Sequence, residues 1–356
     1  MLFQTFIPRT WSHLLEELVS RRLVADIFTF WPPERSSEEL ECYYAPLSKQ
    51  LVDTLVAANA AVWPVYKFPN QFRGLEALVV APPTEREGVL QALAGVGLSL
   101  TQPPKYIFEL LCNSESVSIL DPVVAHKLLL VSPLYYLYSV TSLTRHYQEK
   151  IDEVSRASET DKGLLLDYLL STKNVSNVRG LPLVPVAVGL RVTISNAPGA
   201  PVYTILTRSK FEIFGPCDDS AIPLHRLPRH VADTLLESGP LSVNVQRLNI
   251  ERITDCLSRH SNRLNSDPLE NKTDPSAVRW LSSFWEWFDS YELKDQLFPQ
   301  VRNPSLLPSM KGLRRADSAL FQLRGEHHAY TMGYLALGVP FFPREFSEPT
   351  HEVLQR

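Results

Sequence analysis

The chain has 356 residues, of which 44% are hydrophobic and 10% aromatic, so it is long and apolar enough for two or three domains with substantial cores. It carries 35 basic and 39 acidic side chains, and this net charge of −4 excludes a global basic surface for nucleic acid. With 14 glycines against 28 prolines, the composition favours many short elements ended by proline over glycine-rich cofactor loops.

The cysteines and the apolar segments predict a cytoplasmic protein without membrane contact. The four cysteines lie far apart and form no C-x-x-C pair, so we expect reduced, buried thiols at Cys42, Cys112, Cys217 and Cys256. The N-terminus lacks the basic and long apolar regions of a signal peptide. Apolar runs such as 128–131 are far shorter than the roughly 20 residues that cross a bilayer.

Hydrophobic patterning predicts a mixed α/β (α+β) fold in which helices alternate with short strands. In the first part of the chain it predicts helices at 11–24 and 46–60, strands at 62–66 and 75–80, and a helix-rich segment at 106–147. Thr84-x-x-Glu87 predicts a capping box at the start of a further helix, because each side chain would cover an unpaired backbone N–H. Gly95 and Gly97 predict a left-handed stop at the end of that helix.

The second part of the chain continues the alternation. A charged segment at 148–162 precedes a predicted helix at 163–170, strands at 190–194 and 202–206, and a helix from 228 to 237 that ends at Gly239. The polar run 259–274 is predicted to be a linker. It leads to a helix with aromatic residues on all sides, which indicates burial on more than one face. These patterns predict a first unit at 1–150, a central unit at 151–258, the linker at 259–274 and a third unit at 275–356.

One pattern recurs at three places in the chain. A helix is followed by a short apolar strand with an internal proline at Pro64, Pro182 and Pro308, spaced by 182 − 64 = 118 and 308 − 182 = 126 residues. Proline donates no hydrogen bond to a neighbouring strand, so such strands belong at sheet edges. The pattern predicts consecutive helix-plus-short-sheet units of roughly 120 residues. The alternative is chance recurrence in a proline-rich chain.

No stretch carries a recognised catalytic motif. The glycines of the 180–189 segment are nine apart with no following Lys-Ser/Thr, so they form neither a P-loop nor a G-x-G-x-x-G turn. Adjacent side chains point apart, so the pair His327-His328 is predicted to be a surface feature rather than a metal site. Asp218 and Asp219, beside Cys217, are expected in a solvated turn, with a small acidic pocket as the alternative. The sequence therefore predicts no catalytic residue, cofactor or metal.

Two groups of residues are candidates for binding a protein partner. His225, Arg226 and Arg229 form a basic cluster at the start of the predicted 228–237 helix, where an anion can bind the free N–H groups. Basic side chains oppose the helix dipole at that end, so simple exposure is the alternative. Trp280 and Trp287 of the aromatic helix are candidates for docking a partner, with core packing as the alternative.

The segment from Gly163 to Gly189 resembles the repeat region of sacsin and sacsin-like proteins. Its leucine-rich helix ends in Tyr168-Leu-Leu, and Gly180-Leu-Pro-Leu-Val-Pro-Val-Ala-Val-Gly189 follows, where the family writes G-L-P-L-x-P-x-x-x-G. Val188 stands where the family has a small or acidic residue. Further similar phrases occur at 62–65, 222–225 and 306–309, so the resemblance extends over most of the chain.

In that family such repeats follow an ATPase domain of the heat-shock-protein-ninety (GHKL) type and are linked to chaperone and quality-control roles. The Asn-bearing helix and D-x-G-x-G loop of that domain are absent from this sequence. The resemblance therefore implies a non-catalytic scaffold or client-binding segment with protein partners, and a GHKL-type ATPase domain in the same or a neighbouring chain. Two alternatives are an adaptor that docks a partner through the helix at 280–288 and an enzyme without a recognisable motif.

Overall fold

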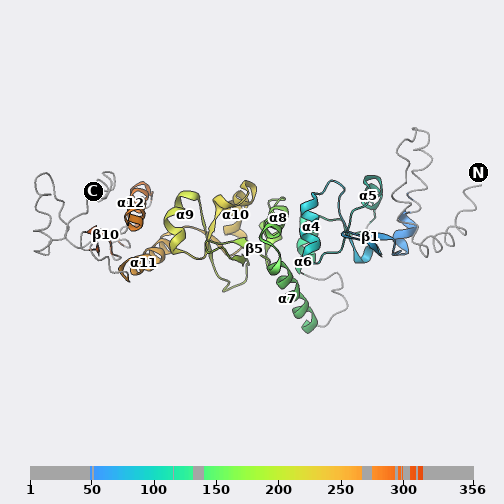
Figure 1. Ribbon diagram of the computed structural model, residues 1–356, viewed down its shortest axis with the longest axis horizontal. Helices are drawn as coiled ribbons and strands as arrows, with labels where there is room; N and C mark the ends of the chain where they lie inside the picture. Colours follow the sequence, from blue (N-terminus) through green and yellow to red (C-terminus); the bar gives the residue numbers. More distant parts are fainter. Residues whose placement is uncertain are drawn as a thin grey trace, which may run out of the picture. The chain divides into compact units, whose positions relative to one another are not determined.

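The computed structural model describes residues 49, 52–114, 116–130, 140–266, 275–292, 296–297, 299, 305–309 and 312–315. These residues form a mixed α/β structure of helices and small two- or three-stranded sheets, which confirms the predicted class (Figure 1). The chain divides into two compact units. Unit 1 comprises Met1–Val184, Arg191–Pro198 and Leu241–Val243, and unit 2 comprises Pro185–Leu190, Gly199–Pro240 and Asn244–Arg356. The domain boundaries predicted from the sequence stay predictions. Cys42, His327-His328 and the predicted helix at 11–24 lie outside the described residues.

Unit 1 is built on a short parallel sheet. An antiparallel hairpin of β1 (Trp63–Val65) and β2 (Phe68–Arg73) comes first, and β3 (Val79–Val80) follows. β3 pairs in parallel both with β4 (Leu100–Thr101) and with Ile119, and the connections are α4 (Glu87–Gly95) and α5 (Lys105–Leu111). The N–H of Tyr66 donates to the carbonyl of Leu100 (2.7 Å), which joins the hairpin to β4.

Unit 1 contains two groups of packed apolar residues. One cluster gathers apolar residues of the hairpin, of β3 and of α5 around the fully buried Trp63. On α4, α6 (Pro122–Leu130) and α8 (Glu159–Leu169), buried leucines and alanines pack these helices together. α7 (Val140–Arg156) connects α6 to α8. These helices therefore contact each other through their buried apolar faces.

Three predicted boundaries in unit 1 are wrong. The first half of the predicted strand 75–80 is the 3₁₀ turn η1 (Leu75–Ala77), so only Val79–Val80 is strand. α8 begins at Glu159 instead of 163, because the Ser158 hydroxyl accepts a hydrogen bond from the N–H of Asp161 (3.0 Å) and caps the helix. The predicted capping box does not form, since α4 starts at Glu87 and its carboxylate accepts hydrogen bonds from the side chains of Tyr66 and Gln91.

The predicted left-handed stop after α4 is confirmed at Gly97, which has φ +82°. A Cβ there would lie 2.5 Å from Nζ of Lys150 and 2.7 Å from Oε2 of Glu153, whereas a Cβ on the exposed Gly95 would meet nothing within 4 Å. We therefore expect Gly97→Ala to lower the free energy of unfolding by about 1–2 kcal/mol. Gly95→Ala is expected to raise it by as much as about 1 kcal/mol, because alanine favours the helix. Thermal unfolding of the two variants tests this, and a loss of stability in both would contradict it.

Unit 2 contains a three-stranded parallel sheet in the order β8-β7-β9. The strands are β7 (Tyr203–Leu206), β8 (Ala221–Pro223) and β9 (Val245–Arg247), and the connections are α9 (Arg208–Phe214) with η4 (Gly215–Cys217), and α10 (Arg229–Ser242). β5 (Pro182–Pro185), which carries two prolines, pairs with β6 (Arg191–Thr193) in a two-stranded sheet that belongs to unit 1 except for Pro185, and its prolines lie at a sheet edge as predicted. Two residues beyond Pro185, the N–H of Ala187 donates to the carbonyl of Ala221 in β8 (2.8 Å).

The predicted end of α10 is wrong. The helix continues through Gly239 and Pro240 to Ser242. Gly239 is buried, and a Cβ on it would lie 3.4 Å from Cγ1 of Val245. Gly239 therefore packs inside the helix beside β9 and does not end the helix as the sequence predicts.

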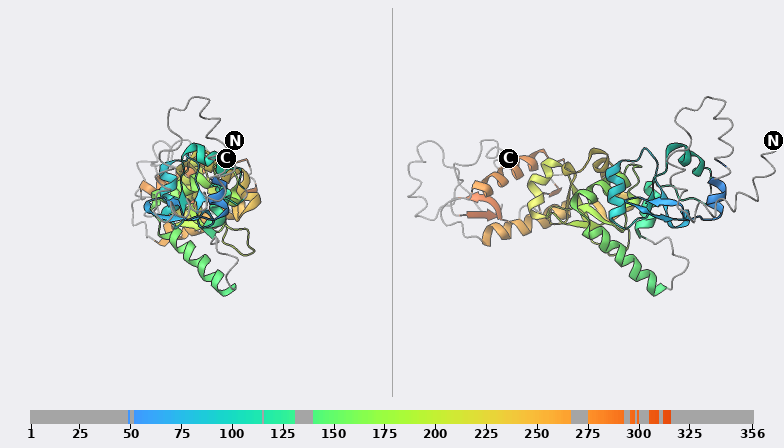
Figure 2. Two further views of the ribbon diagram at one scale, coloured as in Figure 1. Left: turned by 90° about the vertical axis from the view of Figure 1, so that its right-hand side faces the viewer. Right: turned by 45° about the vertical axis from the view of Figure 1, so that its right-hand side comes forward.

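Three elements complete unit 2. They are α11 (Ile250–Ser266), α12 (Pro275–Ser290) and the hairpin of β10 (Ser305–Ser309) and β11 (Gly312–Arg315). α11 covers residues 259–266 of the predicted linker, and residues 267–274 lie outside the described ones. The orange helices α11 and α12 flank the hairpin (Figure 2), and Pro308 lies in β10 as predicted.

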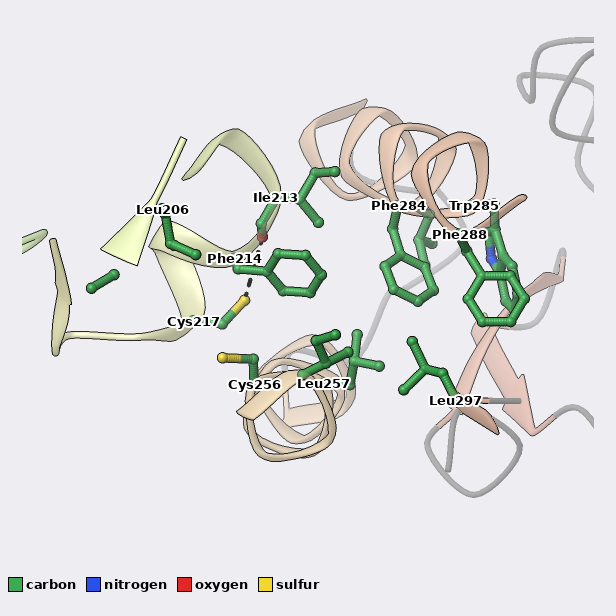
Figure 3. Packing of buried hydrophobic residues seen from close by; sticks show 13 residues of the cluster. Leu206, Ile213, Phe214, Cys217, Cys256, Leu257, Phe284, Trp285, Phe288 and Leu297 are labelled. Atoms are coloured by element: carbon green, nitrogen blue, oxygen red, sulfur yellow. Dashed lines mark hydrogen bonds between the residues drawn. The ribbon is translucent and has the colours of Figure 1, made fainter. Parts of the chain in front are cut away.

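Aromatic side chains of α12 form the centre of the unit 2 core. Phe284 is fully buried, its ring stacks on Trp280 at a centroid distance of 5.6 Å, and it meets the edge of Trp285 at 5.2 Å. Figure 3 shows the rings of Phe284, Trp285 and Phe288 on the side of α12 that faces Leu257 of α11 and Leu297, with Phe214, Cys217 and Cys256 on the side of the sheet. The buried residues Leu281, Phe284, Trp285 and Phe288 form one stripe along α12, whereas Ser283, Glu286 and Ser290 are exposed. The predicted burial of the aromatic helix on more than one face is therefore wrong.

Candidate functional site

The carboxyl ends of β8, β7 and β9 are the part of unit 2 where a ligand is expected, because open parallel sheets bind ligands beyond this edge. β8 ends at Pro223, and the turn η5 (Leu224–Arg226) follows at once. His225 and Arg226 therefore lie at the carboxyl edge, and Arg229 begins the helix that leaves it. The structure brings together the three basic residues that the sequence singles out.

Phe211 of α9 organises the basic residues, although the sequence did not indicate it. The guanidinium carbon of Arg226 lies 4.9 Å from the centroid of the Phe211 ring, and the ring of His225 lies 5.0 Å from it at an angle of 58°. Phe211 is itself partly buried against the unit 2 core. A cation over an aromatic face at an exposed site gains about 0.5–1 kcal/mol, enough to restrict the arginine without removing it from solvent. We call Phe211, His225, Arg226 and Arg229 the basic–aromatic cluster.

The charge of this cluster is only weakly compensated. The guanidinium of Arg226 lies over the Phe211 ring, and no carboxylate of the described residues pairs with it. Arg229 lies 3.8 Å from Asp233, but its side chain is 96% exposed, and such exposed pairs contribute little. The guanidinium of Arg226 thus presents N–H donors in the planar arrangement that matches a carboxylate.

Trp280 and Trp287 have intramolecular contacts. The indole N–H of Trp280 donates to the carbonyl of Ile213 (2.8 Å), and Trp287 meets Phe214 edge-on at 4.8 Å and stacks on Tyr291 at 4.8 Å. Both indoles are partly buried against the unit 2 core. These contacts favour the core-packing alternative, and partner docking by the two residues stays a prediction.

Asp218 is buried, so its predicted place in a solvated turn is wrong, whereas Asp219 is exposed as expected. Only 1% of Asp218 is exposed. Its Oδ1 accepts hydrogen bonds from the N–H (3.0 Å) and hydroxyl (2.5 Å) of Ser220, and its Oδ2 is buried without a partner. The carboxylate therefore holds the turn before β8 from inside, which the Asp-Asp pair in the sequence does not reveal.

A second group of polar residues, in unit 1, was missed by the sequence reasoning. Arg86 pairs with Asp167 of α8 (2.9 Å), and the neighbouring Tyr168 is buried and under the electrostatic influence of charged groups of two other segments. The residues are distant in sequence and match no motif. Only the packing of α8 against α4 and α6 brings them together.

The thiols differ from the prediction at one position. Cys217 and Cys256 are buried, as expected, whereas Cys112 is exposed. Burial, together with the charge of Asp218, raises the pKa of Cys256 to about 12 and makes it a poor nucleophile.

The described residues contain neither a metal-binding cluster nor a membrane-spanning helix. Among them there is no group of three or more His, Cys, Asp or Glu side chains that could hold a metal ion. No helix in the described ranges is both long and apolar enough to cross a membrane.

Comparison of the chain with models of known protein families, with curated proteins and with solved structures found no match.

Proposed function

We propose that this chain is a non-catalytic scaffold or client-binding segment of a sacsin-like chaperone system in cytoplasmic protein quality control. The observation that carries the proposal is the basic–aromatic cluster, a fixed and weakly compensated arginine at the carboxyl edge of a parallel sheet. Such a group suits the carboxylate of an acidic segment in a partner protein. The resemblance of residues 163–189 to sacsin repeats supplies the chaperone context and the GHKL-type ATPase partner.

The proposal includes a repeated architecture. In unit 1 the order of elements is the β1–β2 hairpin, β3, α4, β4, α5 and the strand position Ile119. The β5–β6 hairpin, most of which belongs to unit 1, is followed in the same order by β7, α9, β8, α10 and β9 of unit 2. In both units the first parallel strand lies between the other two. A later helix packs on the first connecting helix in both, α8 on α4 and α12 on α9. This agreement supports repeated units over the alternative, a chance recurrence of proline strands.

The position of the hairpin supports the same proposal and changes which proline of β5 corresponds to Pro64. Tyr66, two positions after Pro64, donates its backbone N–H to Leu100 in β4. Ala187, two positions after Pro185, donates its backbone N–H to Ala221 in β8, the corresponding strand of unit 2. Pro185, not Pro182, is therefore the equivalent of Pro64. The spacings become 185 − 64 = 121 and 308 − 185 = 123 residues, more even than those first inferred.

Binding of an acidic peptide tests the proposed site. A fluorescent hexaglutamate peptide should bind the full chain with an affinity that falls with rising salt, as expected for an exposed charge contact. Arg226→Gln removes the fixed cation and should weaken binding by about tenfold, equivalent to about 1.4 kcal/mol. Fluorescence anisotropy in low and high salt measures both effects.

The matched control is Arg156→Gln, which makes the same change of charge on the exposed end of α7. Equal weakening by both variants would indicate a general charge effect and overturn the site. Suppression of aggregation of several unrelated unfolded proteins would favour the scaffold function over an adaptor, which should instead bind one partner tightly.

A further inference from the structure

The Tyr168 hydroxyl of unit 1 is a buried polar group without a partner. Only 5% of Tyr168 is exposed, and its hydroxyl makes no hydrogen bond within the described residues. The hydroxyl still touches solvent, because it is not among the unpaired polar atoms of the described residues that are fully cut off from solvent. A buried hydroxyl is normally paired, so one that lies unpaired at an opening indicates a place for a ligand.

Charged groups of two other segments act electrostatically on this hydroxyl. Burial first, and then the negative charges of Glu85 and Asp121, raise the pKa of Tyr168, while Arg86 lowers it. The hydroxyl therefore stays neutral. Arg86 is held by Asp167 at 2.9 Å, so its charge is already compensated.

The three segments meet at a specific point of the unit 1 sheet. Glu85 and Arg86 lie in the connection that leaves the carboxyl end of β3, and Asp121 follows Ile119, the neighbouring strand position. β4 pairs with one side of β3, and Ile119 pairs with the other side. The connections that leave β3 and β4 therefore lead to opposite sides of the sheet. Such a switch point is where open parallel sheets bind ligands.

The available acceptors define the chemistry of the ligand. Oε1 of Glu85 accepts the N–H of Arg86 (3.0 Å), and Oδ1 of Asp121 accepts the N–H of Val124 (2.7 Å). Each carboxylate thus has its second oxygen without a partner among the described residues. Together with the Tyr168 oxygen they offer three acceptors, which equals the three donors of a lysine ammonium group.

We propose that Glu85, Asp121 and Tyr168 bind the ammonium group of a lysine side chain in a partner polypeptide. With three carboxylates (Glu85, Asp121 and Asp167) against the guanidinium of Arg86, this edge carries a net charge of 1 − 3 = −2. It is opposite in charge to the basic–aromatic cluster of unit 2, so the inference goes beyond the proposed function and does not depend on it.

Titration of the full chain with short peptides tests the site. Acetyl-Gly-Lys-Gly-amide should bind in the millimolar range in ligand-observed NMR, and acetyl-Gly-Glu-Gly-amide should not. Tyr168→Phe should weaken binding of the lysine peptide by about fivefold without lowering the melting temperature, since the lost hydroxyl has no partner in the fold. Asp121→Asn, which keeps an oxygen to cap α6, and Glu85→Gln should each weaken it similarly.

Asp219→Asn in unit 2 is the matched control and should leave the affinity unchanged. Equal binding of the glutamate peptide, or unchanged binding by Tyr168→Phe, would overturn the proposal. Displacement of the lysine peptide by equimolar magnesium or calcium would also overturn it, because it would identify a metal site instead. The hexaglutamate experiment tests Arg226 in unit 2, and the lysine-peptide experiment tests unit 1. One proposal can therefore be overturned while the other stands.

Discussion

Replacing Phe284 by alanine is expected to lower the free energy of unfolding of unit 2 by about 3–5 kcal/mol, the usual cost of removing a buried phenylalanine. The ring has no exposed surface and contacts four other aromatic rings of α12, those of Trp280, Trp285, Trp287 and Phe288. Its loss leaves a cavity that these rigid rings fill poorly. Urea unfolding followed by tryptophan fluorescence measures the effect, because three of the tryptophans are part of this cluster.

Ser283→Ala is the matched control, since this neighbouring side chain on α12 is exposed. Its effect should stay within about 0.5 kcal/mol, as for most surface substitutions. A small effect of Phe284→Ala would mean that α12 does not form the centre of this core. The arrangement of α9, α11 and α12 in Figure 3 would then be wrong.

Stability is expected to fall steeply above pH 9. The pKa of Cys256 is raised from 9.0 to about 12 by burial, with a contribution from Asp218, and that of Tyr66 is raised from 10.0 to about 12 by burial and Glu87. Between pH 9 and 12 the unfolded chain has lost these protons while the folded chain keeps them. The unfolded state therefore binds fewer protons, and the free energy of unfolding decreases as the pH rises.

Cys256 alone accounts for a loss of as much as about 4 kcal/mol by pH 12, since each pH unit across the shift corresponds to about 1.4 kcal/mol. Cys256→Ala removes the ionisable group and should flatten the decline between pH 9 and 12, at a cost of roughly 1 kcal/mol at neutral pH for the lost packing. Urea unfolding at pH 7, 9 and 10.5 compares the two slopes. Equal slopes would show that the thiol does not carry the effect.

Helices with long leucine patterns and strands bounded by glycine were predictable from local sequence. Gly180 and Gly189 both adopt positive φ, +81° and +79°, and β5 lies between them as the apolar run between two glycines predicts. β6 and β7 lie within the predicted strands 190–194 and 202–206. In each case the signal is in the backbone preference or the periodicity of a few neighbouring residues, which short-range interactions decide.

Element ends were less predictable where tertiary contacts override a local signal. Glu87 is engaged by Tyr66, 21 residues earlier, so it does not complete the box with Thr84. Gly239 continues a helix because it packs beside Val245. The cap at Ser158 is the exception, since Ser158-x-x-Asp161 is itself a local signal that the helical periodicity of 163–170 obscured.

By itself, the sequence determined the mixed α/β class, the proline strands at sheet edges, and the basic residues His225, Arg226 and Arg229 as binding candidates. The tertiary structure alone decided which side chains meet: Phe211 beneath Arg226, Asp218 inside its turn, and Arg86 paired with Asp167. Parallel strands bring together the ends of segments tens of residues apart, and no local pattern encodes that proximity. For the same reason Trp280 and Trp287, which the sequence offers equally to a core or to a partner, face the core of unit 2 only once α9 and α12 are packed.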